Sequence, residues 1–160
     1  MPDKTVEVKI RDAIPADLDF LRDGLRKLDE EMRELGRATG IYRQGLQGLD
    51  VEGCLQREAF LVAANDHERR GFLSIYYPNP TTGALAPSRQ PASINTVYVL
   101  PEFRRQGVAS MLLEAAEAKC RAWGATGIGL GFIEGNHAAE AAYRKAGYVT
   151  TRRAMWRSLD

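Results

Sequence analysis

The stretch that decides the fold is VYVLPEFRRQGVASMLL, which covers residues 97–113. Its apolar residues predict a strand over 94–100 that ends at Pro101, followed by a helix over 106–123 that ends at Gly124. A strand, a short turn and a helix in this order bring several unpaired backbone N–H groups to one point. With the helix dipole, those groups form an anion site that suits a diphosphate.

Four residues of the turn suit a phosphate ligand. Gly107 lets the backbone approach a phosphate closely, and Ala109 leaves the first helical turn uncrowded. Arg104 and Arg105 place positive charge at the rim. An ordinary crossover with one glycine and two exposed arginines would have the same sequence. The turn is neither a P-loop nor a dinucleotide fingerprint, because the glycines of those motifs are absent, so alone it predicts only an anion site.

Periodic hydrophobicity on both sides of this stretch predicts the remaining elements. Further strands are expected over residues 5–11, 60–64, 71–77, 126–133 and 148–157, and further helices over 15–36, 51–58 and 136–145. A polar turn predicts a hairpin between the strands at 60–64 and 71–77, and the strands at 94–100 and 126–133 are expected to be parallel. The segments 40–48 and 78–91 are predicted to be loops. We expect one domain, residues 1–160, of the α+β class, with a mixed sheet flanked by helices.

Composition excludes several classes of protein. The chain has 160 residues, of which 44% are hydrophobic and 27% charged, as in a globular protein. The net charge of +1 gives no overall attraction to nucleic acid or to an anionic membrane. No signal peptide or membrane span is evident, and Cys54 and Cys120 lack metal or redox spacing. We therefore expect a cytoplasmic protein with no metal site, no nucleic-acid partner and no membrane partner.

A second stretch, NHAAEAAYRKAGY at residues 136–148, completes a pattern of two motifs. Together they resemble the GNAT superfamily of N-acetyltransferases, which carries R/Q-x-x-G-x-G/A between a strand and a helix and N-x-x-A-x-x-x-Y-x-K-x-G-F/Y further on. The resemblance covers residues 94–148, and the helix and strand between the motifs also fit. It implies the GNAT fold, with a centrally splayed mixed sheet, and transfer of an acetyl group from acetyl-CoA to a primary amine.

The resemblance also implies which residues bind acetyl-CoA. The backbone of the strand before the turn would hold the pantetheine arm, through Val97, Tyr98 and Val99. Backbone amides of the turn would hold the diphosphate, from Arg104, Arg105, Gln106, Gly107, Val108, Ala109 and Ser110. The strand at 126–133 would splay away from its neighbour. Glycines at 127, 129 and 131 leave one face of that strand bare, which a flexible strand or close helix packing would also explain.

The second motif supplies the expected catalytic residue. Asn136 and Tyr143 are two helical turns apart and so face the same side. The resemblance places Asn136 against the cofactor and Tyr143 near the sulfur, where its phenol would protonate the departing thiolate. A backbone N–H, that of Val99, would stabilise the thioester oxyanion. Without the family pattern, Tyr143 would be interpreted as a packed aromatic residue.

The base that deprotonates the amine is not assigned by the sequence. Some family members carry a carboxylate on the strand before the turn, but here that strand offers no base at neutral pH: it has Ser93, Asn95, Thr96 and Tyr98. Glu102, Glu134 and His137 are weak candidates, so deprotonation through water is favoured.

The acceptor is expected to be a small molecule, because nothing in the sequence indicates an extended peptide groove. An acidic cluster, Asp29, Glu30, Glu31 and Glu34, would attract a cationic amine or simply form a solvated face. Tyr42, Tyr76 and Tyr77 could line the acceptor pocket or pack. Three alternatives stay open: a protein N-terminal or lysine acetyltransferase, a CoA-binding sensor without catalysis, and a nucleotide-binding protein. Met155 and Trp156 would suit a homodimer interface.

Overall fold

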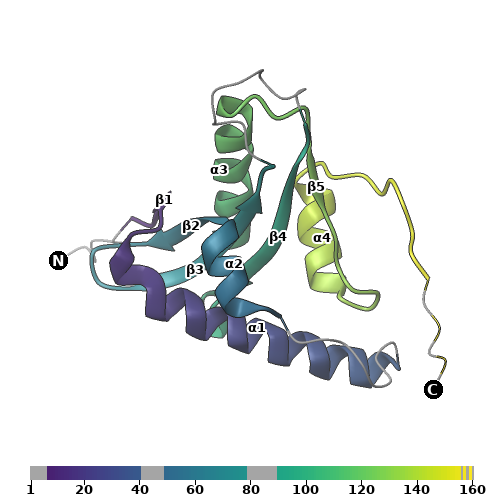
Figure 1. Ribbon diagram of the computed structural model, residues 1–160. Helices are drawn as coiled ribbons and strands as arrows, with labels where there is room; N and C mark the ends of the chain where they lie inside the picture. Colours follow the sequence, from purple (N-terminus) through teal and green to yellow (C-terminus); the bar gives the residue numbers. More distant parts are fainter. Residues whose placement is uncertain (1–6, 41–48, 79–89, 156, 158, 160) are drawn as a thin grey trace.

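The computed structural model describes residues 7–40, 49–78, 90–155, 157 and 159. A five-stranded sheet in the order β1-β2-β3-β4-β5 forms its centre (Figure 1). The strands are β1 (Lys9–Asp12), β2 (Ala59–Ala64), β3 (Arg69–Tyr76), β4 (Ala92–Val99) and β5 (Ile128–Leu130). Neighbours are antiparallel except β4 and β5, which are parallel. The predicted mixed sheet and α+β class are confirmed.

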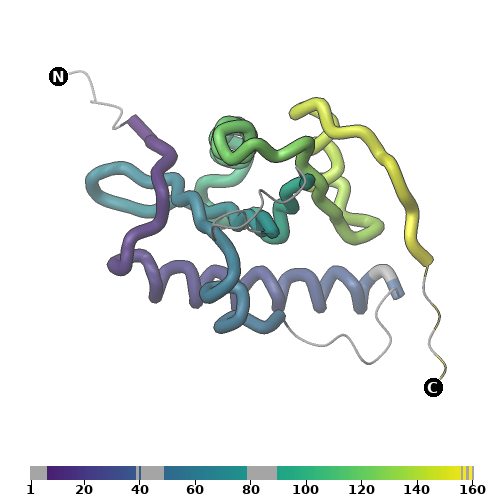
Figure 2. The backbone as a smooth tube through the Cα atoms, turned by 45° about the horizontal axis from the view of Figure 1, so that its top comes forward, coloured from purple at the N-terminus to yellow at the C-terminus, as the bar shows by residue number. Residues whose placement is uncertain are grey.

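Helices cover both faces of this sheet. They are α1 (Leu18–Thr39), α2 (Val51–Arg57), α3 (Val108–Ala122) and α4 (His137–Lys145), with short 3-10 turns at η1 (Pro15–Asp17) and η2 (Pro101–Phe103). Figure 2 shows α1 running along one face of the sheet, with α3 on the other. Among the described residues, no helix combines the length and apolar character that crossing a membrane requires.

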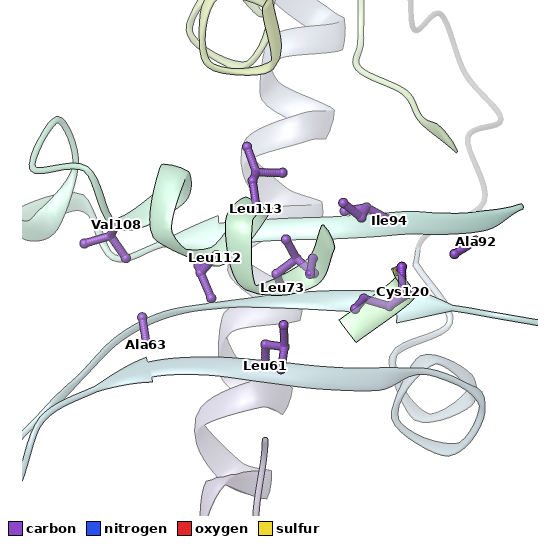
Figure 3. Packing of buried hydrophobic residues seen from close by; sticks show 11 residues of the cluster. Leu61, Ala63, Leu73, Ala92, Ile94, Val108, Leu112, Leu113 and Cys120 are labelled. Carbon is purple, nitrogen blue, oxygen red and sulfur yellow. The ribbon is translucent and has the colours of Figure 1, made fainter. Parts of the chain in front are cut away.

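Two hydrophobic clusters hold these layers together. The first lies between α3 and the sheet and includes Leu73, Leu112 and Leu113 (Figure 3). The second lies between the opposite face of the sheet and the α1–α2 pair, and centres on Phe72. A Cβ at Gly24 would collide with the Phe72 ring. Because residue 24 is a glycine, α1 can approach the sheet at this point.

A β-bulge at Asn95 divides β4 into two parts. The register with β3 shifts by one residue there: Ile75 is opposite Ile94, but Ser74 is opposite Thr96. Ile94 packs in the α3 cluster and, after the bulge, so does Val97. A regular strand would put residues 94 and 96 on one face, so the extra residue reverses which side chains point toward α3. The predicted strand at 94–100 did not include this bulge.

Several predicted boundaries were wrong. The first helix passes Gly36, which is buried, and ends at Gly40, whose φ of +71° is the left-handed conformation typical of a helix end. The third helix begins at Val108 rather than at residue 106. The strand expected at 126–133 forms only over Ile128–Leu130, because only these residues pair with β4. Within the described residues, the first strand covers Lys9–Asp12 and leaves out residues 7 and 8, and residues 1–6 of the chain lie outside the described part.

The final strand predicted over 148–157 is not present in the described residues of that segment. A strand needs a hydrogen-bonded neighbour, and this segment runs away from the sheet (Figure 1). Val149 is 79% exposed and Met155 is 99% exposed. The predicted homodimer interface there stays a prediction. Trp156 and most of the predicted loops, residues 41–48 and 79–89, lie outside the described residues.

Asp17 anchors the start of α1 to the sheet. Its carboxylate is completely buried and accepts hydrogen bonds from Arg11 at 2.6 Å, from Arg69 at 2.6 Å and from the Ile14 amide at 2.9 Å. The bond from Arg11 outweighs burial and, with the other two, holds the pKa of Asp17 well below its usual range. The folded state thus favours the charged carboxylate.

We expect Asp17→Asn to lower the free energy of unfolding by about 3 kcal/mol at pH 7, because it leaves two arginines without their buried partner. Asp17 stabilises the fold only while ionised. The difference between wild type and variant should therefore narrow as the pH falls below about 4. Urea unfolding at pH 7 and at pH 3 measures this. The exposed pair of Asp12 with Lys119 is the control, since Asp12→Asn should cost less than about 1 kcal/mol. A constant difference at both pH values would contradict the assignment.

Candidate functional site

The candidate site begins where β4 and β5 separate. The two strands pair only from Ala92 to Ile94, opposite Ile128 to Leu130, and the bulge at Asn95 follows directly. Beyond it, β4 remains paired with β3, so its other edge has no strand beside it. This is the predicted central splay of the sheet.

The bulge decides which backbone groups face this open edge. The Leu100 amide donates to the Arg70 carbonyl at 2.9 Å, so residue 100 faces β3. Backbone groups of successive residues alternate between the two edges of a strand, so Tyr98 also faces β3, while Val97 and Val99 face the open edge. The Tyr98 side chain is buried against Phe72 on the α1 face. The geometry therefore offers Val97 and Val99, and not the predicted Tyr98, for backbone contacts with a ligand.

The turn after β4 has the shape of an anion cradle. Gly107 is the residue that caps the start of α3; its φ is +82°, and no side chain caps the helix. The amides of Val108, Ala109 and Ser110, in the first helical turn, have no acceptor within the helix. Arg105 also has a positive φ, of 62°. A Cβ at Gly107 would meet nothing within 4 Å, so a ligand can approach this end of the helix.

The two arginines of the turn make different contacts. Arg104 Nε donates to the Val99 carbonyl at 2.9 Å, and its guanidinium pairs with Glu31 at 2.8 Å. Arg104 therefore joins β4 to α1 instead of standing at the rim, where the sequence placed it. Arg105 is exposed and makes no hydrogen bond or ion pair with the described residues, so its charge is available to an anion. Gln106 donates to the Glu102 carbonyl at 3.0 Å and closes the turn.

On the second motif, Asn136 and Tyr143 differ in role. The Asn136 side-chain oxygen accepts from the Ala139 amide at 3.2 Å and caps α4, so this oxygen is already used. The Tyr143 ring lies 6.1 Å from Phe132 and 6.3 Å from Tyr148, against the α3-side cluster that Val97 and Val99 also contact. Its hydroxyl has no hydrogen-bond partner among the described residues. Burial raises the pKa of Tyr143, which keeps the phenol protonated at neutral pH.

The glycines beside β5 face open space. A Cβ at Gly127 or Gly131 would meet nothing within 4 Å, and one at Gly129 would meet only the Ala92 carbonyl, at 3.9 Å. Close packing of a helix therefore does not explain these glycines. Their effect is to leave space along this strand.

The acidic cluster at the end of α1 contributes to a groove of about 380 Å³ between α1 and the end of β4. Lining residues are Lys27, Glu30, Glu31, Glu34, Tyr98, Leu100, Pro101 and Glu102. Asp29 does not line it, because it binds Arg33 and the Leu49 amide. A second hollow, of about 280 Å³, lies between α3, β5 and the end of α4 and contains none of the predicted site residues.

The predicted pocket tyrosines do not form one pocket in the described structure. Tyr77 stacks on Trp123, with ring centroids 5.8 Å apart, and Tyr76 is exposed. Tyr42 lies outside the described residues. In the part of the chain that the structure covers, no group of three or more His, Cys, Asp and Glu side chains is placed to hold a metal ion.

One residue of the site was missed by the sequence analysis. Glu58 lies between α2 and β2, and its Oε1 accepts from Asn95 Nδ2 at 2.8 Å, at the bulge of β4. Its Oε2 is buried and has no hydrogen-bond partner among the described residues. No motif marks Glu58, because its contact with Asn95 joins residues 37 positions apart.

Comparison with known proteins decides the family. The model of the acetyltransferase (GNAT) family matches residues 25–148 of the sequence. The chain belongs to the GNAT acetyltransferase family. A search of curated protein sequences found no match.

Solved structures share the fold of this GNAT protein. An aminoglycoside N-acetyltransferase, AAC(6')-Iy, solved with CoA, is 20% identical with a TM-score of 0.70, over 99% of this chain and 97% of that one. A tetramutant of the BH1408 protein from Bacillus halodurans is 19% identical with a TM-score of 0.71, over 94% and 99%. An acetyltransferase from Trypanosoma brucei is 19% identical with a TM-score of 0.66, over 96% and 100%.

The turn before α3 can be tested with two matched glycine variants. Gly107→Ala and Gly124→Ala alter opposite ends of α3, at φ values of +82° and +80°, and neither added Cβ would meet an atom within 4 Å. Each should lower the free energy of unfolding by about 1 kcal/mol, the cost of a left-handed residue. Only Gly107→Ala should weaken CoA binding, by about tenfold, if it costs one bond to a charged phosphate. Calorimetry with CoA measures this, and equal CoA affinity in the two variants would refute the cradle.

Proposed function

We propose that this GNAT protein is an acetyl-CoA-dependent N-acetyltransferase that acts on a primary amine of a small molecule. The observation that carries the proposal is the open edge of β4 between the bulge at Asn95 and the anion cradle at the start of α3. A pantetheine arm has two amide groups, and it can pair with such an edge as an added strand would. Its diphosphate would then reach the amides of Val108, Ala109 and Ser110.

The residues along this edge support direct attack on the thioester. The amine nitrogen would attack the acetyl carbonyl carbon, and a backbone N–H on the open edge of β4 would stabilise the oxyanion that forms. When the C–S bond breaks, Tyr143 would give its proton to the departing thiolate. A phenol whose pKa is raised by burial holds that proton at neutral pH, as a general acid must.

A cationic small molecule is the acceptor that the groove between α1 and β4 favours. Four glutamates line it against one lysine, Lys27, which forms its ion pair with Asp23. Glu30, Glu34 and Glu102 form no hydrogen bond or ion pair with the described residues, so the lining is negatively charged overall. Its volume of about 380 Å³ lies in the range of small-ligand sites, about 300–1,000 Å³. One structural neighbour is described as a complex of AAC(6')-Iy with the bisubstrate analogue CoA-S-monomethyl-acetylneamine.

An assay of released thiol tests the proposal. Acetyl-CoA would be offered with aminoglycosides, polyamines, simple primary amines, and peptides with a free N-terminus or lysine. Turnover with small cationic amines is the expected result. Turnover with peptides alone would indicate a protein acetyltransferase. Binding of acetyl-CoA without acetylation of any amine would indicate a sensor, and preference for ATP or NAD over CoA in calorimetry would indicate a nucleotide-binding protein.

Tyr143→Phe tests the general acid. The variant should bind CoA like wild type, because the ring and its contacts with Phe132 and Tyr148 are retained. Its kcat should fall by about a hundredfold or more, the usual contribution of a positioned proton donor. Steady-state kinetics and CoA calorimetry measure the two effects. Tyr76→Phe is the matched control, since Tyr76 is exposed and should tolerate the change. An unchanged kcat in Tyr143→Phe would exclude this role.

The double variant Glu30→Gln with Glu34→Gln tests the acidic groove. Loss of two negative charges should raise the KM for a dicationic amine by up to about tenfold, with a smaller effect at high salt. The KM for acetyl-CoA should not change. Glu114→Gln, an exposed position on α3, is the control for loss of surface charge. If the KM for the amine is equal in the double variant and the control, the groove does not bind the acceptor.

A further inference from the structure

Glu58 presents a buried carboxylate oxygen to which no N–H or O–H group of the described residues donates. Its Oε1 accepts from Asn95 Nδ2 at 2.8 Å, while Oε2 is buried without a hydrogen-bond partner among the described residues. Buried polar atoms in native proteins are nearly always hydrogen-bonded, since leaving one without a partner costs stability. Since Glu58 lies beside the point where β5 separates from β4, a ligand that donates a hydrogen bond there would satisfy this atom.

The bulge places this carboxylate where the reacting end of the thioester is expected. A pantetheine arm from phosphate oxygen to sulfur spans about twelve covalent bonds, the backbone length of about four residues. Four residues back from Val99 along β4 is Asn95, the donor to Glu58 and the point where β5 separates. An arm that starts at the cradle and follows the open edge of β4 would therefore end near Glu58.

The surroundings of Glu58 fit a group that receives a proton. Cys54, from α2, lies beside it. Burial, then the charge of Glu58 and a weak hydrogen bond from the thiol to that carboxylate, raise the pKa of the thiol to about 11, so it stays neutral. Arg57, next in sequence, pairs with Asp50 at 3.3 Å and not with Glu58. The amide of Asn95 orients the carboxylate without neutralising it. Among the described residues, no ion pair competes with an incoming cation for Glu58.

We propose that Glu58 binds the acceptor ammonium and removes its proton before attack; this rests on the proposed acetyl transfer. The N–H bond breaks and Oε2 takes the proton. The neutral nitrogen then bonds to the acetyl carbon, the C–S bond breaks, and Tyr143 protonates the sulfur. Glu58 lies by the α2 cluster and Tyr143 by the α3 cluster, on opposite faces of the sheet. The amine thus arrives on one face, and the thiolate is protonated from the other.

This role accounts for a departure in the sequence. The strand before the turn carries Asn95 and no carboxylate, so it cannot itself deprotonate an amine. The hydrogen bond from Asn95 to Glu58 brings a carboxylate to that strand from the start of β2. The strand supplies the position, and a residue 37 positions earlier supplies the base.

The pH dependence of kcat/KM for a simple primary amine tests Glu58→Gln. With a carboxylate base, kcat/KM should stay nearly level from neutral pH toward the pKa of the amine, about 10.4. Without it, only the neutral amine reacts, and kcat/KM should rise about tenfold per pH unit over that range. At pH 7 the variant should be at least about a hundredfold slower than wild type. Burial raises the pKa of Tyr143 above that of an ordinary tyrosine, about 10, so the general acid does not lose its proton earlier than a free phenol would.

Two controls separate this role from a structural one. Glu68→Gln removes an exposed glutamate that also accepts from an asparagine side chain, that of Asn65, and should keep the wild-type profile. The swap variant, Glu58→Gln with Asn95→Asp, returns a carboxylate to the same pair. It should restore a level pH profile, and at pH 7 its kcat/KM should be at least about tenfold higher than that of Glu58→Gln. Its CoA affinity, measured by calorimetry, should be unchanged. If Glu58→Gln does not fold, the profile of the swap variant decides.

The results that overturn the proposal are distinct from those that overturn the proposed function. If wild type acetylates no amine, the proposed function fails. If wild type is active and Glu58→Gln has the same pH profile, or is slower by one factor at every pH, Glu58 is not the base. Glu58 is also not the base if the swap variant folds and binds CoA but its kcat/KM rises tenfold per pH unit.

Discussion

The bulge at Asn95 is the constraint on which the rest of the site depends. One extra residue opposite β3 lets β4 stay paired on that side while β5 separates from it on the other. It also turns the backbone groups of Val97 and Val99 toward the open edge, and their side chains toward α3. Without the bulge, the backbone groups of residues 96 and 98, instead of those of Val97 and Val99, would face the open edge that leads to the cradle at the start of α3.

The two faces of the sheet carry different groups beside this open edge. On the α1 side, Arg104 is held by Glu31 and by the Val99 carbonyl, and Phe72 packs where Gly24 lets α1 come close. This side carries the acidic groove and Glu58. On the α3 side, Tyr143 packs against the cluster that contains Leu73 and Leu113. The proposed reaction thus has acceptor groups on one face of the sheet and the proton donor for the thiolate on the other.

Much of the site could be predicted from local sequence, and the misses have local reasons. Apolar spacing predicted β4, α3 and α4, since each repeats with the period of its element. The bulge also left a signal: Ile94 and Val97 share a face although they are three residues apart, which breaks the period of two. The final strand, in contrast, was predicted over residues 148–157 but does not form in the described residues of that segment, because no strand lies beside them to pair with.

The sequence by itself determined the strand, the turn at Gly107 and the helix that follows, together with the interval to Asn136 and Tyr143. Short-range sterics and hydrophobic periodicity fix such features, so they can be predicted without knowing what lies nearby. Only the tertiary structure decided that Arg104 turns to Glu31, 73 residues away, and that Asn95 meets Glu58, 37 residues away. Those contacts depend on how the helices pack on the sheet, and no local pattern records them.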